Sequence, residues 1–529
     1  MPTFSTLADF LSSPITRKIY LVEVTGKRRS GTAGVESITR YYSTEDIATL
    51  PTDSPANREY KGIVRGLPRI KRSMQSILTS GDYSESFPSY GSLLLSNHVK
   101  ELDGDWGVGG YSPDGWALRV EIAGDPDALA FSNRGGVLVG VGGENYTISD
   151  FEMDLPILDN AGEVDKFGAT GTTEGSEFAN LPDGNRGVTK PEIWGEVRNL
   201  KPILVDTVNL TYLVAAHVCH DILSVYSNAV PLSEVYGYIP DESNANGARF
   251  DLVNNPNNAE ITCDVMGYKM QQTGVFSHKL GDIIEDVVLR KTALTVSNFD
   301  SAALTRFKSD SPYDTGAPFD VGIAVTRPTK VRDVIRQLLS GIPSLTTIDR
   351  NGKFVLSAFY PPVGPADLTF SDDIEILGES PITVLRPIQS AMIGYDNVEF
   401  TQDGGRLATS VTPARAAHLA REFRVASISS SVTDVHPLAS SRGPIQSRLL
   451  NRTDAVDVAS RHADLFGVKR YLVKARFKVQ PLSVSLNAVV DFKRDRLGLN
   501  PSGSNLWRVV DIEEELGRQQ STVTLGLWQ

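Results

Sequence analysis

The N-terminal part of the chain consists of short apolar runs separated by turn-forming residues. The run 14–24 ends in an alternation of apolar and polar side chains, and five further runs follow at 39–43, 62–65, 90–96, 116–122 and 136–141. Strand-like runs at this spacing are typical of an antiparallel sandwich or barrel, in which one face of each strand is buried. We therefore expect residues 1–155 to form an N-terminal β domain.

The central part of the chain changes to a helical period. Val331, Val334, Ile335, Leu338 and Leu339 fall on one face of a helix. Thr329 is placed to cap its N-terminus, and residues 341–343 are placed to end it. The same spacing predicts helices over 280–291 and in the stretch 455–466.

A β-hairpin is expected directly after the 331–339 helix. Asn351 and Gly352 supply the positive φ angles that a two-residue hairpin turn needs, and they lie in the middle of the run 346–356. Further strands are expected at 487–492, 506–512 and 521–528. Strands at both ends with helices between them predict an α+β chain, predominantly β and multi-domain.

Three stretches lack apolar periodicity, and they help to set the expected domain boundaries. Gly-rich residues 156–189 are expected to be a long loop, with an Asn-rich stretch at 240–259 and a Ser-rich one at 427–446. The expected units are a β domain at 1–155, the loop at 156–189, a β-rich segment at 190–275, an α+β domain at 276–365 and a β-rich C-terminal region with one helix at 366–529.

The charge and the cysteines limit the possible functions. A formal net charge of −12 argues against a protein that grips phosphates, although it suits a surface past which DNA must slide. Cys219 and Cys263 match neither a disulfide framework nor a metal knuckle, and we expect both to be small buried apolar residues. Neither a signal peptide nor a membrane-spanning segment is expected.

The chain carries no sequence motif that marks a catalytic or cofactor site. The serine-hydrolase elbow, the zinc-protease motif and the phosphate loop are all missing, and the glycines at 107–110 and 140–143 lack dinucleotide spacing. His217 and His220 flank Cys219, but no further ligand can be named for a metal. We therefore assign no catalytic, cofactor-binding or metal-binding residue and do not expect an enzyme.

Acidic pairs and two tryptophans are the remaining candidates for chemistry. Two carboxylates can hydrolyse a glycosidic bond, and tryptophans can stack on sugars or fill a core. Such residues are common in an acidic chain, so we expect the carboxylates to be surface groups and the tryptophans to be core. The carboxylates are Asp103 and Asp105, Asp372 and Asp373, and 513–515; the tryptophans are Trp106 and Trp116.

One segment resembles a known family. The run 190–206 contains Lys190-Pro191, Gly195, Asn199 and a Pro-x-Leu-x-Asp sequence, and the run 221–232 ends in Val-Pro-Leu. This order resembles the tail-tip, or baseplate hub (distal tail-like), proteins of long-tailed bacteriophages and prophages. Ser227 and Ala229 stand where that family has Asp and Gly. Shorter similarities extend through 20–24, 53–60, 90–104, 280–362 and 486–528, which include a short helix near 301–307.

The resemblance implies a structural virion protein at the distal end of the tail. Such a protein links the tail tube to fibres or a central spike, forms part of the channel through which DNA leaves, and is made in the host cytoplasm. A homotrimer is the expected assembly, with a homohexamer as the alternative, and the expected partners are tail tube, distal tail and fibre or spike proteins. The competing hypothesis is a receptor- or carbohydrate-binding tail module.

Overall fold

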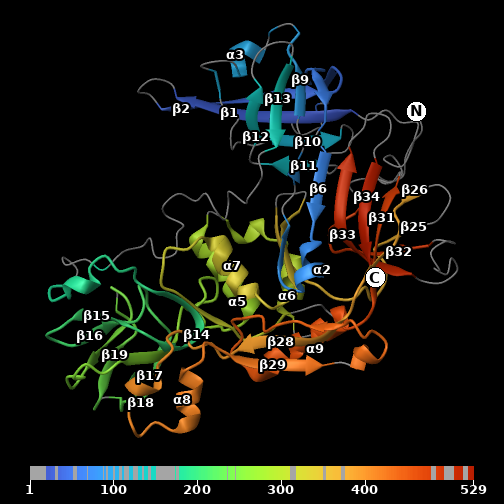
Figure 1. Ribbon diagram of the computed structural model, residues 1–529. Coiled ribbons are helices and arrows are strands. Elements are labelled where there is room, and N and C mark those ends of the chain that lie inside the picture. The colour runs from blue at the N-terminus through green and yellow to red at the C-terminus, as the bar shows by residue number, and fades with distance from the viewer. Residues whose placement is uncertain are drawn as a thin grey trace.

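The protein is a predominantly β, multi-domain α+β chain whose strands form several sheets (Figure 1). The computed structural model describes residues 19–29, 34–49, 51, 56–67, 69–86, 89–90, 93–98, 100, 102–106, 110–111, 118–122, 129–133, 136–140, 145–150, 173, 178–234, 236–244, 246–292, 294–309, 317–349, 353–370, 376–429, 431–477, 484–493, 505–515 and 522–529. No helix among these residues is long and apolar enough to span a membrane.

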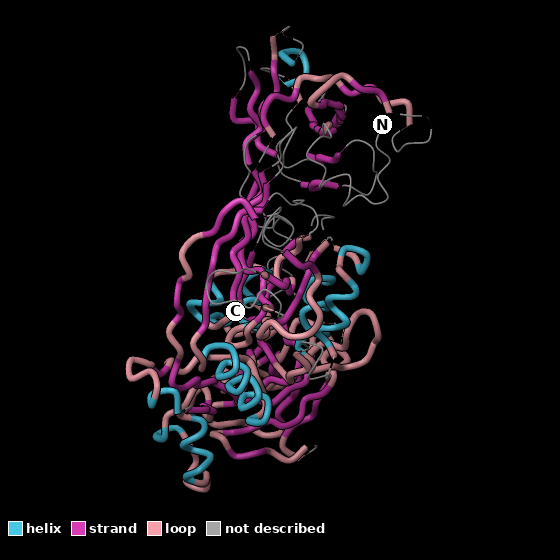
Figure 2. Tube along the Cα trace, turned by 90° about the vertical axis from the view of Figure 1, so that its right-hand side faces the viewer, coloured by secondary structure: helices cyan, strands magenta, loops and turns pink. Residues whose placement is uncertain are grey.

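The N-terminal sheets form a lobe at one end of the molecule (Figures 1 and 2). One sheet has the order β11-β10-β1-β2 and another the order β12-β13-β9-β5, beside the small pair β3-β4 and helix α3. Every predicted strand run contains a strand here, although residues 14–18, 91–92, 116–117 and 141 lie outside the described residues. The elements are β1 (Tyr20–Arg29), β2 (Val35–Ser43), β3 (Ile47–Ala48), β4 (Glu59–Tyr60), β5 (Val64–Gly66), β9 (Leu93–Ser96), α3 (Leu102–Trp106), β10 (Leu118–Ile122), β11 (Leu129–Asn133), β12 (Gly136–Gly140) and β13 (Asn145–Asp150).

A strap from the N-terminal part enters the rest of the molecule. It consists of β6 (Arg69–Ser73), α2 (Ser76–Ser80), β7 (Ser84–Ser86) and β8 (Ser89–Tyr90). Strand β6 pairs antiparallel with the C-terminal strand β33, and β7 pairs parallel with β23 of the central region. Whether residues 1–155 form a separate domain stays a prediction.

The residues after 190 form two small sheets around an apolar core. A five-stranded sheet has the order β18-β17-β21-β14-β22, and a four-stranded sheet has the order β15-β16-β20-β19. The Asn-rich stretch 240–259 was expected to lack regular structure, but it contributes to β19 and contains β20, because Phe250 and Leu252 bury their side chains in this core. The elements are η2 (Asp183–Asn185), β14 (Glu192–Leu200), β15 (Ile203–Asp206), β16 (Thr211–Leu213), β17 (Asp221–Ser227), β18 (Val230–Pro231), β19 (Tyr238–Asp241), β20 (Arg249–Leu252), β21 (Ile261–Met266) and β22 (Gly322–Val325).

The central helices pack into the largest apolar core. Helix α5 (Leu280–Lys291) confirms the prediction for 280–291, and Arg290 and Lys291 in its last turn suit the negative end of the helix dipole. Helices α6 (Ser301–Lys308) and α7 (Val331–Leu339), with η3 (Val296–Asn298), complete the group. The predicted Thr329 cap is wrong: Lys330 is the N-cap residue, and the Thr329 hydroxyl donates to the Arg327 carbonyl at 2.9 Å.

The predicted hairpin follows α7 as β23 (Ser344–Ile348) and β24 (Phe354–Ala358), paired antiparallel from Ser344 with Ala358 to Ile348 with Phe354. Residues 350–352 of its turn lie outside the described part. Glycine at 341 has a φ of +81° and follows the helix end, as expected.

The C-terminal region contains a sheet that also takes in β6, and a separate three-stranded sheet covered by helix α9. The Ser-rich stretch 427–446 was expected to be irregular, but it contains the end of β29, then η5 and β30. The elements are β25 (Leu368–Phe370), β26 (Ile376–Glu379), β27 (Thr383–Leu385), β28 (Ile388–Tyr395), η4 (Gly404–Arg406), α8 (Pro413–Leu419), β29 (Arg424–Ser429), η5 (Ser431–Asp434), β30 (Ser440–Ser441), α9 (Arg452–Phe466), β31 (Arg470–Phe477), β32 (Val489–Phe492), β33 (Leu506–Glu515) and β34 (Thr522–Trp528).

Candidate functional site

The histidine and cysteine group at 217–220 is part of the packing of the sheet. His217 Nε2 accepts a hydrogen bond from Ile193 N at 3.0 Å, and its ring stacks on Tyr268. Burial lowers the pKa of His217 to about 3, so the ring is neutral. The ring of His220 stacks instead on Phe276, and burial raises the pKa of the Cys219 thiol. In the described part of the chain, no three His, Cys, Asp or Glu side chains are placed to hold a metal.

The first acidic pair and its neighbouring tryptophan take part in local contacts. Asp105 receives two hydrogen bonds of 2.6 Å from Arg40, and Asp103 accepts one from Asn97 Nδ2 at 2.7 Å. Trp106 is buried, and its Nε1 donates to the Tyr42 hydroxyl at 2.7 Å. Trp116, Asp372 and Asp373 lie outside the described residues, as do the glycines at 107–109 and 141–143.

The acidic run 513–515 lies on β33 beside the strap strand β6. Arg69 pairs with Glu513 at 2.9 Å, and Arg72 pairs with Glu514 at 3.2 Å. The side chains of Arg72 and Glu514 are 6% and 0% exposed, whereas those of Arg69 and Glu513 are 58% and 33% exposed. The run therefore holds two parts of the chain together rather than offering carboxylates to a substrate.

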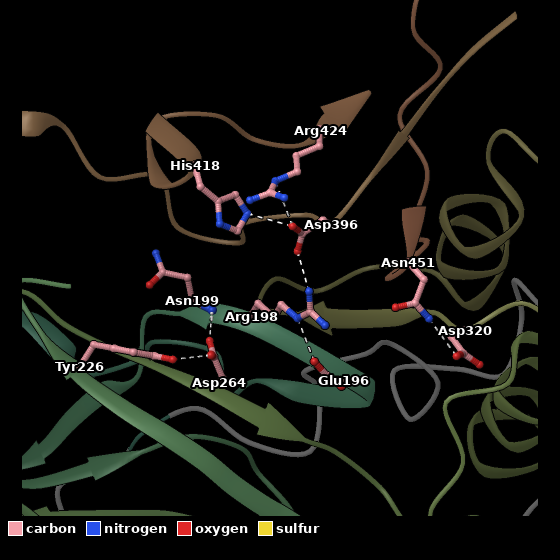
Figure 3. A network of polar contacts seen from close by, with 10 residues as sticks. All are labelled: Glu196, Arg198, Asn199, Tyr226, Asp264, Asp320, Asp396, His418, Arg424 and Asn451. Atoms are coloured by element: carbon pink, nitrogen blue, oxygen red, sulfur yellow. Dashed lines mark hydrogen bonds and ion pairs between the residues drawn. The ribbon is translucent and has the colours of Figure 1, made fainter. Parts of the chain in front are cut away.

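A polar network of long-range partners is centred on Arg198 of β14 (Figure 3). Arg198 Nε donates to Glu196 at 2.8 Å, and its Nη1 donates to Asp396 Oδ1 at 2.7 Å. The other carboxylate oxygen of Asp396 lies 3.1 Å from His418 Nε2 and 3.2 Å from Arg424 Nε. The network thus joins β14 to the segment 396–424, which we call the clip.

The charge balance of this network favours its ionised form. Burial opposes the ionisation of Asp396, but hydrogen bonds and charges from His418 and Arg198 outweigh it and lower the pKa of that carboxyl below its usual value. Burial also opposes the charge on Arg198, but the hydrogen bonds that it donates to Glu196 and Asp396, together with the charges of these carboxylates, raise its pKa. A carboxylate held in this way is a poor general acid at neutral pH, and its evident role is to fix the clip.

Residues of the family-like segment 190–232 serve backbone geometry around the same network. Gly195 has a φ of +69°, and a β-carbon there would lie 2.0 Å from the Val321 carbonyl oxygen, so only glycine fits. Asn199 also has a positive φ, of 52°; its N donates to Asp264 at 2.7 Å and its Nδ2 to the Phe400 carbonyl. Tyr226 donates to the same Asp264 at 2.7 Å.

The turn after β17 explains one departure from the family pattern. Ser227 pairs with Val230 across a two-residue turn, in which Asn228 and Ala229 have φ angles of 45° and 67°. Glycine suits such a turn best, because a side chain there is strained. Ala229 is nevertheless 1% exposed and packs with Val398 and Leu419 of the clip, so its methyl group fills an apolar cluster.

None of these long-range partners was assigned from the sequence. Arg198 and Asp396 are 198 residues apart, and no spacing or composition signal links them. The pattern around Gly195 and Asn199 was the available signal, and it pointed to a family resemblance rather than to a contact.

No family model and no curated protein matches the chain. Among solved structures, the 43 kDa tail protein of prophage MuSo2 from Shewanella oneidensis is similar at 10% identity and a TM-score of 0.36, over 96% of this chain and 98% of that one. A tail protein from Neisseria meningitidis MC58 is similar at 7% identity and a TM-score of 0.37, over 96% of each chain. A chain of the native gene transfer agent virion reaches 12% identity and a TM-score of 0.41, over 66% of this chain and 87% of that one. With TM-scores below 0.5, these likenesses establish neither the fold nor the function of this chain.

Proposed function

We propose that the chain is a non-enzymatic structural protein at the distal end of a bacteriophage tail. It acts there as a tail-tip or baseplate hub that links the tail tube to fibres or a central spike. One observation carries the proposal: the residues of the family-like segment set backbone geometry and contact the clip. Gly195 allows a close approach of β14 to Val321, Asn199 donates to the Phe400 carbonyl, and the 228–229 turn packs on the clip. A segment whose residues set backbone geometry and hold another segment, rather than present a reactive group, suits an assembly protein better than an enzyme.

The proposed assembly is a homotrimer, with a homohexamer as the alternative. Rings around a tail axis are built by cyclic symmetry, which requires complementary surfaces on each copy. Strand β2 offers one such element: in the described part of the chain it pairs with β1 along its whole length. On its other side, Ser43 N donates to the Lys61 carbonyl, and Lys61 N donates to the Tyr41 carbonyl. No other strand of the described part pairs with this edge over residues 35–40, and we propose this stretch as a contact with a neighbouring copy.

The proposed partners are tail tube, distal tail and fibre or spike proteins, with DNA passing through the lumen. The acidic excess supports a channel that does not hold DNA, because carboxylates repel phosphates at short range. A lumen lined mainly by Lys and Arg in the assembled tail would overturn this part of the proposal.

The experiment that tests the proposal is electron microscopy of intact virions labelled with antibody against this chain. Label in a small ring at the distal end of the tail is expected, and its symmetry would distinguish three copies from six. Label on side fibres would favour the alternative function, and virions without label would overturn the structural role.

The alternative, a receptor- or carbohydrate-binding tail module, loses one of its candidate residues in the structure. Trp106 was a candidate for stacking on sugar, but it is 2% exposed and donates to Tyr42. A glycan array probed with the purified chain separates the two functions, because a hub is expected to retain no glycan.

A further inference from the structure

The turn after helix α7 receives ionisable side chains from two other elements. Gly341 N donates to Asp82 Oδ1 of the strap at 2.5 Å. The Gly341 carbonyl accepts a hydrogen bond from His462 Nε2 of α9 at 2.8 Å. Both backbone groups of one glycine therefore bond to side chains whose charge can change, and these come from opposite ends of the chain.

Arg442 lies between the strap and α9. Its guanidinium lies over the ring of Phe466 of α9, 4.5 Å from the ring centre. On the strap side, a β-carbon at Gly81 would overlap Nη1 of Arg442, and this glycine also has a left-handed φ of +69°, so only glycine fits there. The strap is thus in close contact with a cation that rests on α9. We call Asp82, Gly341, Arg442 and His462 the latch.

The surroundings of His462 offer no acceptor for a second ring proton. A carbonyl can only accept, so the proton of the neutral ring sits on Nε2. Nδ1 is buried and has no hydrogen-bond partner among the described residues. Residues 338–342 of the α7 end and the strands β28 and β29, on which α9 packs, carry no carboxylate. On α9 itself, Asp457 pairs with Arg461 at 3.0 Å.

His462 resists protonation as long as the latch is closed. Burial, together with the positive charge of Arg442, lowers the pKa of the ring from 6.5 to about 4. The open latch then binds the proton more readily than the closed one, so opening is favoured as the pH falls from 6.5 towards 4. Asp82 acts in the opposite sense: burial raises its pKa, so its protonation favours the closed latch and offsets part of the effect at the acid end.

The latch holds one end of the strap, and other contacts hold the rest. Next to the latch, Glu85 pairs with Arg332 and Arg336 of α7 at 2.8 and 3.1 Å. At the other end of the strap, β6 is held by backbone pairing with β33. Opening of the latch would therefore loosen the turn between α2 and β7 without removing β6 from its sheet.

We propose that the latch is an acid-sensitive switch: protonation of His462 releases the strap turn from α9 and loosens the attachment of the N-terminal lobe to α7. An added proton on Nδ1 would be a buried donor without an acceptor, beside the cation of Arg442. The proposal does not depend on the proposed tail role, because every contact of the latch lies within one chain.

The test is hydrogen exchange of the full-length protein, measured by mass spectrometry at about pH 7 and about pH 5 and corrected for the intrinsic exchange rate. The readout is the opening equilibrium of the amides in 81–86 and 338–343. Between the two pH values, the lowered pKa of His462 predicts a roughly 20-fold increase in opening. The amides of β6 should change far less.

His462→Gln separates protonation of the ring from other effects of acid. The glutamine amide can still donate to the Gly341 carbonyl, but it takes up no proton in this range. The increase in opening should therefore fall to less than about threefold. His98→Gln is the matched control, at an exposed histidine of the N-terminal lobe, and it should keep the full increase.

Arg442→Met tests the second member of the latch. The methionine can keep the apolar contact with Phe466 but carries no charge, so the folded ring of His462 becomes easier to protonate. The increase in opening between the two pH values should therefore be smaller than in wild type. This variant keeps the test decisive if His462→Gln does not fold.

A wild-type latch whose opening does not grow between neutral pH and about pH 5 would overturn the proposal. So would the same increase in His462→Gln as in wild type, or a larger one in Arg442→Met. These outcomes are distinct from those of the proposed function. Distal label on virions without acid-dependent opening removes only the switch, and acid-dependent opening without label removes only the tail role.

Discussion

The molecule joins its parts in two different ways. The N-terminal strap is held by backbone pairing, since β6 adds a strand to the C-terminal sheet from Arg69 opposite Glu515 to Ser73 opposite Asp511. The clip is held to β14 and β17 by side chains, through Arg198, Asp396 and the methyl group of Ala229. Beside these side chains, only isolated backbone hydrogen bonds from residues 399, 400 and 408 to the carbonyls of 198, 199 and 228 are described, without a continuous strand pairing. We call these two attachments the strand joint and the side-chain joint.

The difference predicts how each joint responds to change. Backbone hydrogen bonds of a strand depend little on which side chains it carries, so the strand joint tolerates substitutions except where a charge is buried. A side-chain joint depends on single atoms and on their ionisation. The strand joint is therefore expected to resist acid, and the side-chain joint to weaken in it.

The largest effect is expected at the buried charge of the strand joint. Glu514→Gln removes the carboxylate that pairs with Arg72, leaving a buried guanidinium without its counter-charge. Breaking one partner of a buried pair costs about 3–5 kcal/mol. Hydrogen exchange of the β6 and β33 amides, measured by mass spectrometry, should show their opening free energy fall by that amount.

Glu513→Gln is the matched control, because Glu513 is the next residue and its pair with Arg69 is exposed. It should cost less than about 1 kcal/mol. Equal effects of the two substitutions would mean that backbone pairing alone holds the strap and that the buried pair adds nothing.

A smaller effect is expected in the side-chain joint. Asp396→Asn removes one charge from a network in which Arg198 keeps Glu196 as a second partner. The loss of opening free energy should be about 1.5–3 kcal/mol, the range for a hydrogen bond to a charged group. The amides of β28 should exchange faster, while those of β6 stay protected. Loss of protection in both places would show that the two joints are coupled.

Acid should remove the contribution of Asp396. The pKa of this carboxyl is lowered from 3.8 in the folded chain, so its stabilisation is complete above the unfolded value and is lost as the pH falls through the folded one. The difference in β28 opening free energy between wild type and Asp396→Asn should therefore shrink as the pH falls below about 4. If the difference between the two proteins grew below about pH 4, the pKa of Asp396 would not be lowered in the folded chain.

The periodicity of apolar residues was enough to predict individual helices and strands, but it did not predict the contacts of the strand joint and the side-chain joint. Helix α5 was predicted at its observed bounds, because four apolar residues on one face need no distant partner to indicate a helix. The stretch 240–259 was misjudged, since Phe250 and Leu252 form a short strand only when an existing core receives them. Thr329 was misjudged because a hydroxyl can bond to several nearby backbone groups.

The contacts of the candidate site lie beyond sequence patterns for a similar reason. Asp396 accepts a hydrogen bond from Arg198, which is 198 residues away in the sequence, and Ala229 packs in an apolar cluster with the similarly distant Leu419. The family-like pattern singled out the segment 190–232 but did not indicate which distant residues contact it. Ala229 illustrates this limit. The family-like pattern has glycine at this position, and the packing of the alanine methyl group against Val398 and Leu419 of the clip explains why alanine stands there.

The smallest effect is expected at that residue. Ala229→Gly relieves a left-handed φ of 67°, worth about 1–2 kcal/mol for a residue with a β-carbon. It also removes a buried methyl group, worth about 0.8 kcal/mol, and makes the unfolded chain more flexible by about 0.4–1 kcal/mol. These terms nearly cancel, so opening free energies of β17 and the clip should change by less than about 0.5 kcal/mol.

Ala426→Gly is the control, at a buried β29 residue without positive φ. It relieves no backbone strain, so the opening free energy should fall by about 1–2 kcal/mol. If Ala229→Gly cost as much as this control, packing against the clip would dominate at the turn and the strain would be negligible there.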